Sequence, residues 1–270
     1  MSQAKKIIIN GCAGRMGQAL TRLVLDDPRL ELAGGLEAPD SAALGTDLGT
    51  LAGRAPCGIG ATDDALTALK DADAVIDFSD PAVSVALAGL AAQARIAHII
   101  GTTGFSAEEE ADIEAAARHA SIVKSGNMSL GINLLAGLVR QAAGALDWDI
   151  EILDMHHRDK VDAPSGTALL LGAAAAQGRN AVFEDVKQSG RDGLTGARRN
   201  GDIGIAALRG GSVVGDHEVI FAGPHEQIRL AHRAEDRDIF ARGALEAAYW
   251  ACAQPHGLYD MADVLGLGRG

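Results

Sequence analysis

A short basic segment of this chain carries the side chains best suited to chemistry. His156, His157, Arg158 and Lys160 lie within five positions, and Pro164-Ser165-Gly166-Thr167 follows shortly after them. Imidazole and ammonium groups can donate protons, and cationic side chains can hold carboxylates or stabilise developing negative charge. The segment therefore predicts a pocket for a carboxylate substrate, with proton donors beside it.

The segment lies between a predicted strand and a predicted helix. Residues 148–155 alternate apolar and acidic side chains, which is typical of a half-buried strand. Ser165 is suited to be an N-cap, and the Ala- and Leu-rich run after it predicts a helix that ends near Gly178. The backbone N–H groups of Gly166 and Thr167, at the start of this helix, would form an anion site.

The two adjacent histidines are expected to have different roles, because neighbouring side chains on an extended segment face opposite ways. His156, at the strand end, is the better proton donor. His157, Arg158 and Lys160 are candidates to hold carboxylates. The alternative is a solvated basic turn in which these cations pair with nearby aspartates: Asp154, Asp159 and Asp162. The segment alone leaves both interpretations open.

A glycine-rich turn near the N-terminus predicts a dinucleotide site. Gly11, Gly14 and Gly17 follow an apolar strand and open a helix. Such glycines let the backbone approach a pyrophosphate, and the helix N-terminus supplies N–H donors. Glu37, 20 residues after Gly17 at the end of the next strand, is placed to bind the ribose. A tight turn without a ligand and an adenosylmethionine-binding turn are the alternatives.

The acidic residue also bears on which nicotinamide cofactor is used. The Glu37 carboxylate can accept hydrogen bonds from ribose hydroxyls but repels a 2′-phosphate. Ala38 follows, where an arginine would be needed to bind that phosphate. The sequence therefore predicts NADH in preference to NADPH. NADPH use is possible, because Arg15 could partly compensate.

The order of the patterns predicts an α/β fold. In the first half, short apolar runs alternate with helical segments, which favours a doubly wound parallel sheet. Loops that follow three of these strands, at 77–81, 101–105 and 124–129, would line the ribose and nicotinamide. After Trp148, strands with period-2 alternation and Gly-rich turns predict a second domain with an antiparallel or mixed sheet.

Composition narrows the class of protein further. The 270 residues are 47% hydrophobic and carry a net charge of −12, which argues against nucleic acid as a partner. The three cysteines show no metal-binding spacing, so no metal is expected. The sequence offers no apolar run of membrane-spanning length and no signal-peptide core, so we expect a cytoplasmic protein without a membrane partner.

Several motifs occur in an order that resembles one enzyme family. They are Gly11-x-x-Gly14-Arg15-Met16-Gly17, Asp77-Phe78-Ser79, Gly101-Thr102-Thr103-Gly104-Phe105, Asn127-Met128-Ser129-x-Gly131, His156-His157-Arg158-x-Lys160 continuing to Thr167, and Arg209-x-Gly211-x-Val213-Val214-Gly215-x-His217. Together they are similar to the 4-hydroxy-tetrahydrodipicolinate reductases (dihydrodipicolinate reductases) of diaminopimelate and lysine biosynthesis. The resemblance spans nearly the whole chain, and the segment from His156 to Thr167 is its most specific part.

The resemblance implies a Rossmann domain at residues 1–127 and 237–270. It also implies an α+β domain with a mixed sheet at 128–236, which binds substrate and forms a homotetramer. His156 and Lys160 would be catalytic, and His157, Ser165, Gly166 and Thr167 would bind a cyclic imine dicarboxylate. Domain closure would bring the catalytic pair to the nicotinamide. The implied cofactor contacts are Gly11, Cys12, Ala13, Gly14, Arg15, Met16, Glu37, Gly101, Thr102, Thr103, Ser125, Gly126, Asn127 and Met128.

One departure and two other functions accompany this resemblance. Ala38 stands where many relatives have arginine, which argues against the use of NADPH. Another NAD-dependent dehydrogenase, for example one acting on aspartate, would share the glycine turn without needing the basic segment. A non-catalytic dinucleotide-sensing module would have no reason to place His156 and Lys160 together.

Overall fold

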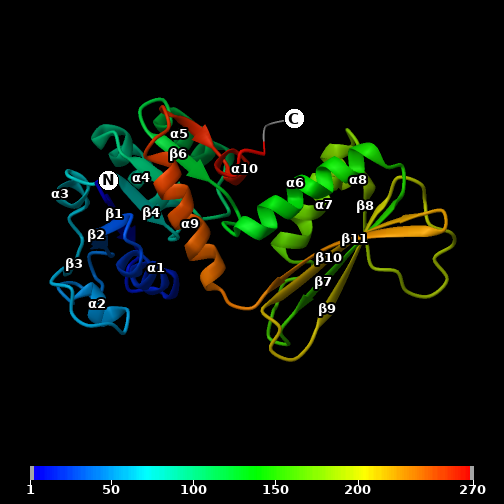
Figure 1. Cartoon of the computed structure of the whole chain (residues 1–270), viewed down its shortest axis with the longest axis horizontal. Coiled ribbons are helices and arrows are strands. Elements are labelled where there is room, and N and C mark those ends of the chain that lie inside the picture. The colour runs from blue at the N-terminus through cyan, green and yellow to red at the C-terminus, as the bar shows by residue number, and fades with distance from the viewer. Residues whose placement is uncertain (1–2, 268–270) are drawn as a thin grey trace. The chain divides into compact units, whose positions relative to one another are not determined.

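The computed structural model describes residues 3–267, which form two compact units (Figure 1). One unit extends to Ser129 and resumes at Asp238, so the C-terminal part of the chain returns to it. The other unit comprises Leu130–Arg237.

The first unit is built on a seven-stranded parallel sheet in the order β12-β6-β5-β4-β1-β2-β3. The order turns back beside β1, and ligands of such sheets bind at the carboxyl ends of the strands near this point. The strands are β1 (Lys5–Asn10), β2 (Leu30–Leu36), β3 (Ala61–Thr62), β4 (Ala74–Asp77), β5 (Ala97–Ile100), β6 (Ser121–Lys124) and β12 (Gly257–Tyr259).

Helices cover both faces of this sheet. One face carries α1 (Arg15–Asp26) against α9 (Asp238–Ala251), with α10 (Met261–Val264) beside α9. The other carries α3 (Ala65–Leu69), α4 (Pro81–Ala94) and α5 (Ala107–Ala116), and α2 (Leu48–Leu51) lies near α1. Strands covered on both sides have no polar face, which explains why Ile7, Ile8 and Ile9 are all fully buried.

Local sequence signals set the starts of these helices. Asp80 caps α4 by accepting a hydrogen bond from the Val83 N–H, and Pro81 occupies the first helical position. Ser106 and Glu109 form a capping box at α5. By contrast, α1 has Gly14 at its N-cap and no side-chain cap. The start of α1 is therefore built differently from the starts of α4 and α5.

The second unit contains a five-stranded mixed sheet in the order β11-β10-β7-β9-β8. Strand β10 pairs antiparallel with β7 and β11, whereas β9 pairs parallel with β7 and β8. The elements are α6 (Leu130–Ala145), β7 (Asp149–His156), α7 (Gly166–Gly178), α8 (Phe183–Val186), β8 (Lys187–Ser189), β9 (Ile203–Arg209), β10 (Gly215–Gly223) and β11 (Glu226–Ala234).

Helices α6 and α7 cover one face of this second sheet. On β7 the buried positions alternate, so that Ile150 and Ile152 point into the core below the helices. The opposite face carries half-buried apolar side chains, among them Leu153, Met155 and Ile220. The unit thus has one face packed on its own helices and a second face that is partly apolar.

The predicted fold class is confirmed: a Rossmann-type parallel sheet is joined to a unit with a mixed sheet. After Ser189, which ends β8, the polar segment to Asp202 contains no further helix or strand. In the rest of this segment, Arg191 and Arg198 form ion pairs with Glu151. No helix within residues 3–267 is long and apolar enough to cross a membrane.

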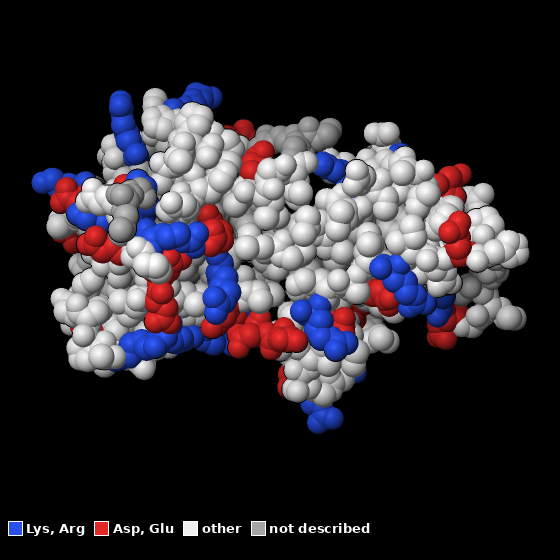
Figure 2. Space-filling model, viewed as in Figure 1, with Lys and Arg blue, Asp and Glu red and all other residues white. Residues whose placement is uncertain are grey.

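Charged side chains of both signs are interspersed on the face drawn in Figure 2, rather than separated into a basic and an acidic region. Several ion pairs lie at the surface of the first unit, such as Arg29 with Glu246 and Arg54 with Asp26. This face therefore lacks the extended basic surface that nucleic-acid binding would favour.

Candidate active site

The glycine turn between β1 and α1 is as tight as the sequence suggests. Gly11 has a φ of 68°, and a Cβ at Gly17 would overlap the Gly11 carbonyl oxygen and lie 2.6 Å from Cys12 Cα. The first helical hydrogen bond shown for α1 runs from the Gln18 N–H to the Gly14 carbonyl. The N–H groups of the helix start precede that bond and suit a pyrophosphate.

Glu37 lies beside this turn, as the fingerprint requires. Its Oε1 accepts a hydrogen bond from the Ala13 N–H at 2.7 Å. An acid at this position is the one that dinucleotide-binding folds use for ribose hydroxyls. Burial, with Glu37 nearby, raises the pKa of the Cys12 thiol to about 12, so this side chain has no role as a nucleophile.

A buried carboxylate links the loops at the carboxyl ends of β1, β4 and β5. Asp77 is fully buried and accepts hydrogen bonds from Asn10 Nδ2 at 2.9 Å and from Ser84 Oγ at 2.6 Å. Ser79 donates to it through its backbone N–H and its hydroxyl. The Ser84 hydroxyl also lies 2.9 Å from Thr102 Oγ1, a predicted cofactor contact. This network links the loops that the sequence predicts to line the cofactor.

Ionisation of Asp77 is favoured by its surroundings. Burial acts to raise the pKa of this carboxyl, but His98, Ser79 and Ser84 outweigh it and lower the pKa to about 2. The His98 ring lies beside this carboxylate, with its Nε2 3.5 Å from Asp77 Oδ2. From the sequence, Asp77 was identified only as part of a family motif. Its role in linking the loops after β1, β4 and β5 was not predicted.

The other predicted cofactor residues differ in exposure. Gly14, Arg15, Thr103 and Gly126 are exposed, whereas Cys12 and Met128 are each only 1% exposed. The remaining predicted residues are half-buried or buried at the same edge of the sheet: Gly11, Ala13, Met16, Glu37, Gly101, Thr102, Ser125 and Asn127.

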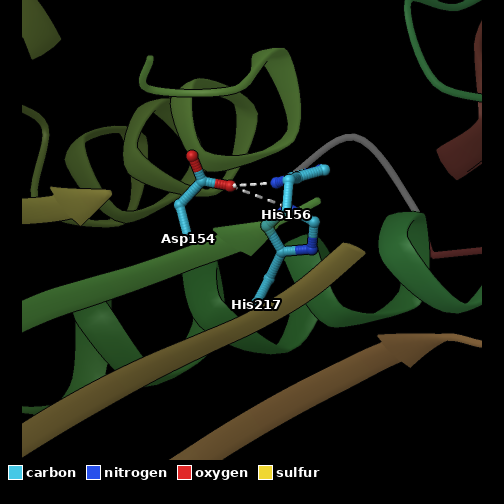
Figure 3. A group of neighbouring side chains, drawn as sticks. All are labelled: Asp154, His156 and His217. Carbon is cyan, nitrogen blue, oxygen red and sulfur yellow. Dashed lines mark ion pairs between the residues drawn. The ribbon is translucent and has the colours of Figure 1, made fainter. Parts of the chain in front are cut away.

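In the second unit, the end of β7 brings three titratable side chains together (Figure 3). Asp154 and His156 lie two positions apart on the buried face of β7, and His217 lies opposite Asp154 on β10. Asp154 Oδ1 is 2.9 Å from His156 Nδ1 and 3.3 Å from His217 Nε2. The two imidazole rings meet edge to face at 5.1 Å.

The Asp154 carboxylate is held from its other side. Its Oδ2 accepts a hydrogen bond from the Ser165 N–H at 2.8 Å and lies 3.3 Å from the Arg209 guanidinium. Burial acts to raise the pKa of Asp154, but His217, Ser165 and His156 outweigh it and hold the pKa well below its usual range. The carboxylate is therefore ionised at neutral pH.

His156 is the predicted proton donor that this arrangement serves. Burial lowers its pKa, Asp154 acts to raise it, and the nearby charges of His217, Lys160 and Arg209 lower it further. The imidazole is thus neutral near pH 7 and can accept or return a proton.

The remaining residues of the basic segment have different surroundings. His157 follows the end of β7, and its Nε2 lies 3.4 Å from the Arg237 guanidinium. Lys160 donates a hydrogen bond to Asp162 at 2.7 Å, so part of the alternative interpretation, a basic residue paired with a neighbouring aspartate, applies to it. Arg158 is exposed.

The start of α7 matches its prediction. Ser165 caps the helix by accepting a hydrogen bond from the Ala168 N–H at 3.2 Å, and its hydroxyl lies 3.3 Å from His217 Nε2. Both polar groups of Ser165 therefore have partners inside the protein. Gly166 is exposed and Thr167 half-buried, and both directly follow Ser165, whose N–H donates to Asp154.

Three residues of the site were missed by the sequence analysis: Asp154 was placed only in the alternative interpretation, and His217 and Arg209 appeared only in a motif. One signal could have found Asp154. It falls on the same alternating face as Ile150, Ile152 and His156, so the alternation, continued to the end of the strand, would have placed an acid at a buried position beside a candidate base. His217 and Arg209 come from other strands, and only the pairing of β7 with β10 and β9 shows their proximity.

Among residues 3–267, Asp154, His156 and His217 form the one group whose donor atoms are close enough to coordinate a metal ion. The cation of Arg209 already neutralises this carboxylate, and the charge of Lys160 acts on His156. These neighbouring cations oppose a divalent ion and favour a cluster that handles protons. The absence of a metal stays a prediction.

Comparisons with known proteins match both units. A family model described as "Dihydrodipicolinate reductase, N-terminus" matches residues 5–128, and one described as "Dihydrodipicolinate reductase, C-terminus" matches residues 131–265. A protein from Parvibaculum lavamentivorans named 4-hydroxy-tetrahydrodipicolinate reductase is 67% identical over 265 residues, covering 97% of this chain and 98% of that protein. A protein of the same name from Brucella abortus is 58% identical, with coverages of 97% and 98%.

A solved structure shares the fold of the chain. It is a dipicolinate-bound dihydrodipicolinate reductase from Paenisporosarcina sp. TG-14, with a TM-score of 0.78 at 23% identity. The match covers 97% of this chain and 99% of that one, so both units are included.

Proposed function

The chain belongs to the dihydrodipicolinate reductase family, and from this premise we propose that the proton chemistry of its reaction takes place at the end of β7. The reaction is the NAD(P)H-dependent reduction of 4-hydroxy-tetrahydrodipicolinate to tetrahydrodipicolinate, a step of diaminopimelate and lysine biosynthesis. The observation that carries the site assignment is the neutral, buried His156 next to Asp154 and the start of α7.

The first unit is assigned to the cofactor, whose nicotinamide supplies the hydride. The uncapped start of α1 and the close approach of Gly17 to Gly11 fit a pyrophosphate, and Glu37 fits the adenosine ribose. The loops after β5 and β6 would hold the nicotinamide half. NADH is the preferred cofactor in this proposal, because Glu37 and Ala38 offer no cation to a 2′-phosphate.

The second unit is assigned to the substrate, a cyclic imine dicarboxylate. Its two carboxylates need positive partners, which the start of α7 at Gly166 and Thr167 and the side chain of His157 would supply. Ser165 contributes by fixing the helix start through its cap. Specificity for a dicarboxylate would follow from these two separate anion sites.

Reduction of the conjugated ring with loss of water requires proton transfer as well as hydride. His156 would accept and return a proton through its imidazole, and Lys160 would donate a proton and stabilise negative charge. Release of Lys160 from Asp162 would be needed for this, and a bound dicarboxylate offers the ammonium group a competing partner.

The partly apolar face of the second sheet suits assembly. Leu153, Met155 and Ile220 lie on the face opposite α6 and α7, where another subunit would remove them from water. We infer a homotetramer formed through this face, and a cytoplasmic location in keeping with the biosynthetic role.

A coupled assay tests the function. The substrate is made freshly from pyruvate and aspartate semialdehyde by the preceding synthase, and nicotinamide oxidation is followed at 340 nm after the chain is added. The account predicts oxidation that depends on both the synthase product and this chain. NADH oxidation with oxaloacetate and ammonia in its place, or NAD+ reduction with aspartate, would favour an amino-acid dehydrogenase. Cofactor binding without any turnover would favour a sensing module.

A further inference from the structure

The carboxylate of Asp154, two residues before His156, has been given no part in the reaction above. We propose that Asp154 is a positioning residue, whose carboxylate orients the His156 imidazole and keeps its proton on Nδ1, so that Nε2 exchanges protons with the substrate. The proposal rests on the function proposed above for His156, and its test separates the two.

The carboxylate is itself immobilised. Asp154 is fully buried, and its Oδ2 is held by the Ser165 N–H at 2.8 Å and by Arg209 at 3.3 Å. Ser165 is fixed at the N-cap of α7, and Arg209 lies opposite His156 on β9. With one oxygen held in this way, the other, Oδ1, faces the two imidazole rings.

The short contact between Asp154 and His156 decides where the ring proton lies. Oδ1 and Nδ1 are 2.9 Å apart, although they are not aligned as a standard hydrogen bond. At this distance a lone pair on Nδ1 would face an ionised oxygen and repel it. The charge therefore favours the neutral form with its proton on Nδ1, and the lone pair is placed on Nε2.

The surroundings of Nε2 fit a reactive atom. Gly215 lies beside it, and a Cβ at this position would come within 3.2 Å of His156 Nε2 and 3.3 Å of His217 Cε1. The edge of His217 packs on the His156 ring at an interplanar angle of 71°, which restrains ring rotation. Asp154, His217 and Gly215 together leave one ring nitrogen engaged and the other approachable.

The tautomer is measured directly by ¹⁵N NMR of the histidines in the full-length chain, with His156→Gln used to assign the signal. We expect neutral His156 to be protonated on Nδ1 in the wild type. In Asp154→Asn the tautomer should become mixed. A wild-type His156 protonated on Nε2 would overturn the proposal, whether or not Asp154→Asn folds.

Kinetics supply the second readout. Asp154→Asn should lower kcat on the order of 10²- to 10⁴-fold with little change in the dissociation constant of the cofactor. Because the Asp154 charge raises the pKa of His156, its loss should move the corresponding limb of the pH–rate profile to lower pH. A merely structural role would lower activity without moving that limb.

Asp149→Asn is the matched control, because Asp149 is an exposed residue of the same strand that pairs with Arg198. It should leave the tautomer and the pH profile unchanged. If His156→Gln keeps full turnover while the tautomer is as expected, the proposed function of His156 fails and the positioning contact stands. If the pH limb of Asp154→Asn stays in place, the positioning role fails.

Discussion

Asp77 ties together the loops of the cofactor unit, and its titration should be visible in the stability of the protein. Its folded pKa of about 2 lies below the usual value of 3.8, so its stabilising effect is present above pH 4 and is lost as pH falls toward 2. The difference corresponds to on the order of 2 kcal/mol. Urea unfolding followed between pH 2 and pH 7 measures it.

The variant Asp77→Asn isolates this contribution from those of other acids. The substitution removes the carboxylate charge that accepts hydrogen bonds from Asn10, Ser79 and Ser84. We therefore expect the variant to be less stable than the wild type at pH 7. The gap between the two proteins should narrow as pH falls toward 2. A gap that is constant with pH would contradict the ionised state of Asp77.

Cofactor choice is a second property of single residues. Glu37 and Ala38 lie where a 2′-phosphate would be met, so wild-type kcat/KM should be higher with NADH than with NADPH. Ala38→Arg should raise the NADPH value by roughly tenfold or more, because a charged hydrogen bond to phosphate is gained. Equal or better efficiency of the wild type with NADPH would contradict the role given to Glu37.

Part of the candidate site could be predicted from the sequence, because several of its residues are close together in the chain. His156, Lys160 and Ser165 were identified from one continuous segment, and the N-cap role of Ser165 is confirmed. Two neighbouring residues, His217 and Arg209, could not be found in this way, because they lie on other strands. The ion pair of Lys160 with Asp162 was anticipated only as an alternative.

At the scale of elements, the turn from β1 to α1 should tolerate no side chain at Gly17. Gly17→Ala would place its Cβ against the Gly11 carbonyl and 2.6 Å from Cys12 Cα, so the turn must open. We expect loss of cofactor binding, measured by fluorescence titration with NADH, together with lower thermal stability. Gly89→Ala is the control, since it meets no atom within 4 Å and should slightly stabilise α4. Unchanged binding in Gly17→Ala would argue against the assigned pyrophosphate site.

The same scale shows which elements a sequence can predict. Buried runs such as Leu30–Leu36 and capped helices such as Ala107–Ala116 carry strong local signals, which is why alternating strands and helices could be predicted in the first half of the chain. Short pieces such as β3 (Ala61–Thr62) and β12 (Gly257–Tyr259) were missed. They are strands because a neighbouring strand offers hydrogen bonds, and not because of their own composition.

At the scale of the whole molecule, the apolar face of the second sheet should control assembly. Native mass spectrometry of the wild type is expected to give a tetramer. Ile220→Glu replaces a half-buried apolar side chain of that face by a charge of the same sign as its cross-strand neighbour Glu151, and should yield smaller species. Leu66→Glu, at a site that is 68% exposed in the first unit, should leave the tetramer intact. A monomeric wild type, or a tetramer that survives Ile220→Glu, would contradict the proposed interface.

The proposed function assigns cofactor binding to one unit and proton transfer to the other. Residues assigned to the cofactor lie in the unit that contains the parallel sheet, and the proton-handling cluster lies in Leu130–Arg237. Loss of a proton donor in the second unit should therefore reduce turnover without affecting cofactor binding in the first.

The most direct measurement is the turnover of His156→Gln and Lys160→Ala set against their affinity for NADH, with His119→Gln and Lys70→Ala as exposed controls. The account predicts that kcat falls by about 10²-fold or more in each site variant, because a general acid–base group contributes on that scale. It also predicts that the dissociation constant of NADH stays within about twofold of the wild type. Wild-type turnover in both site variants would contradict the assignment of the reaction to the end of β7.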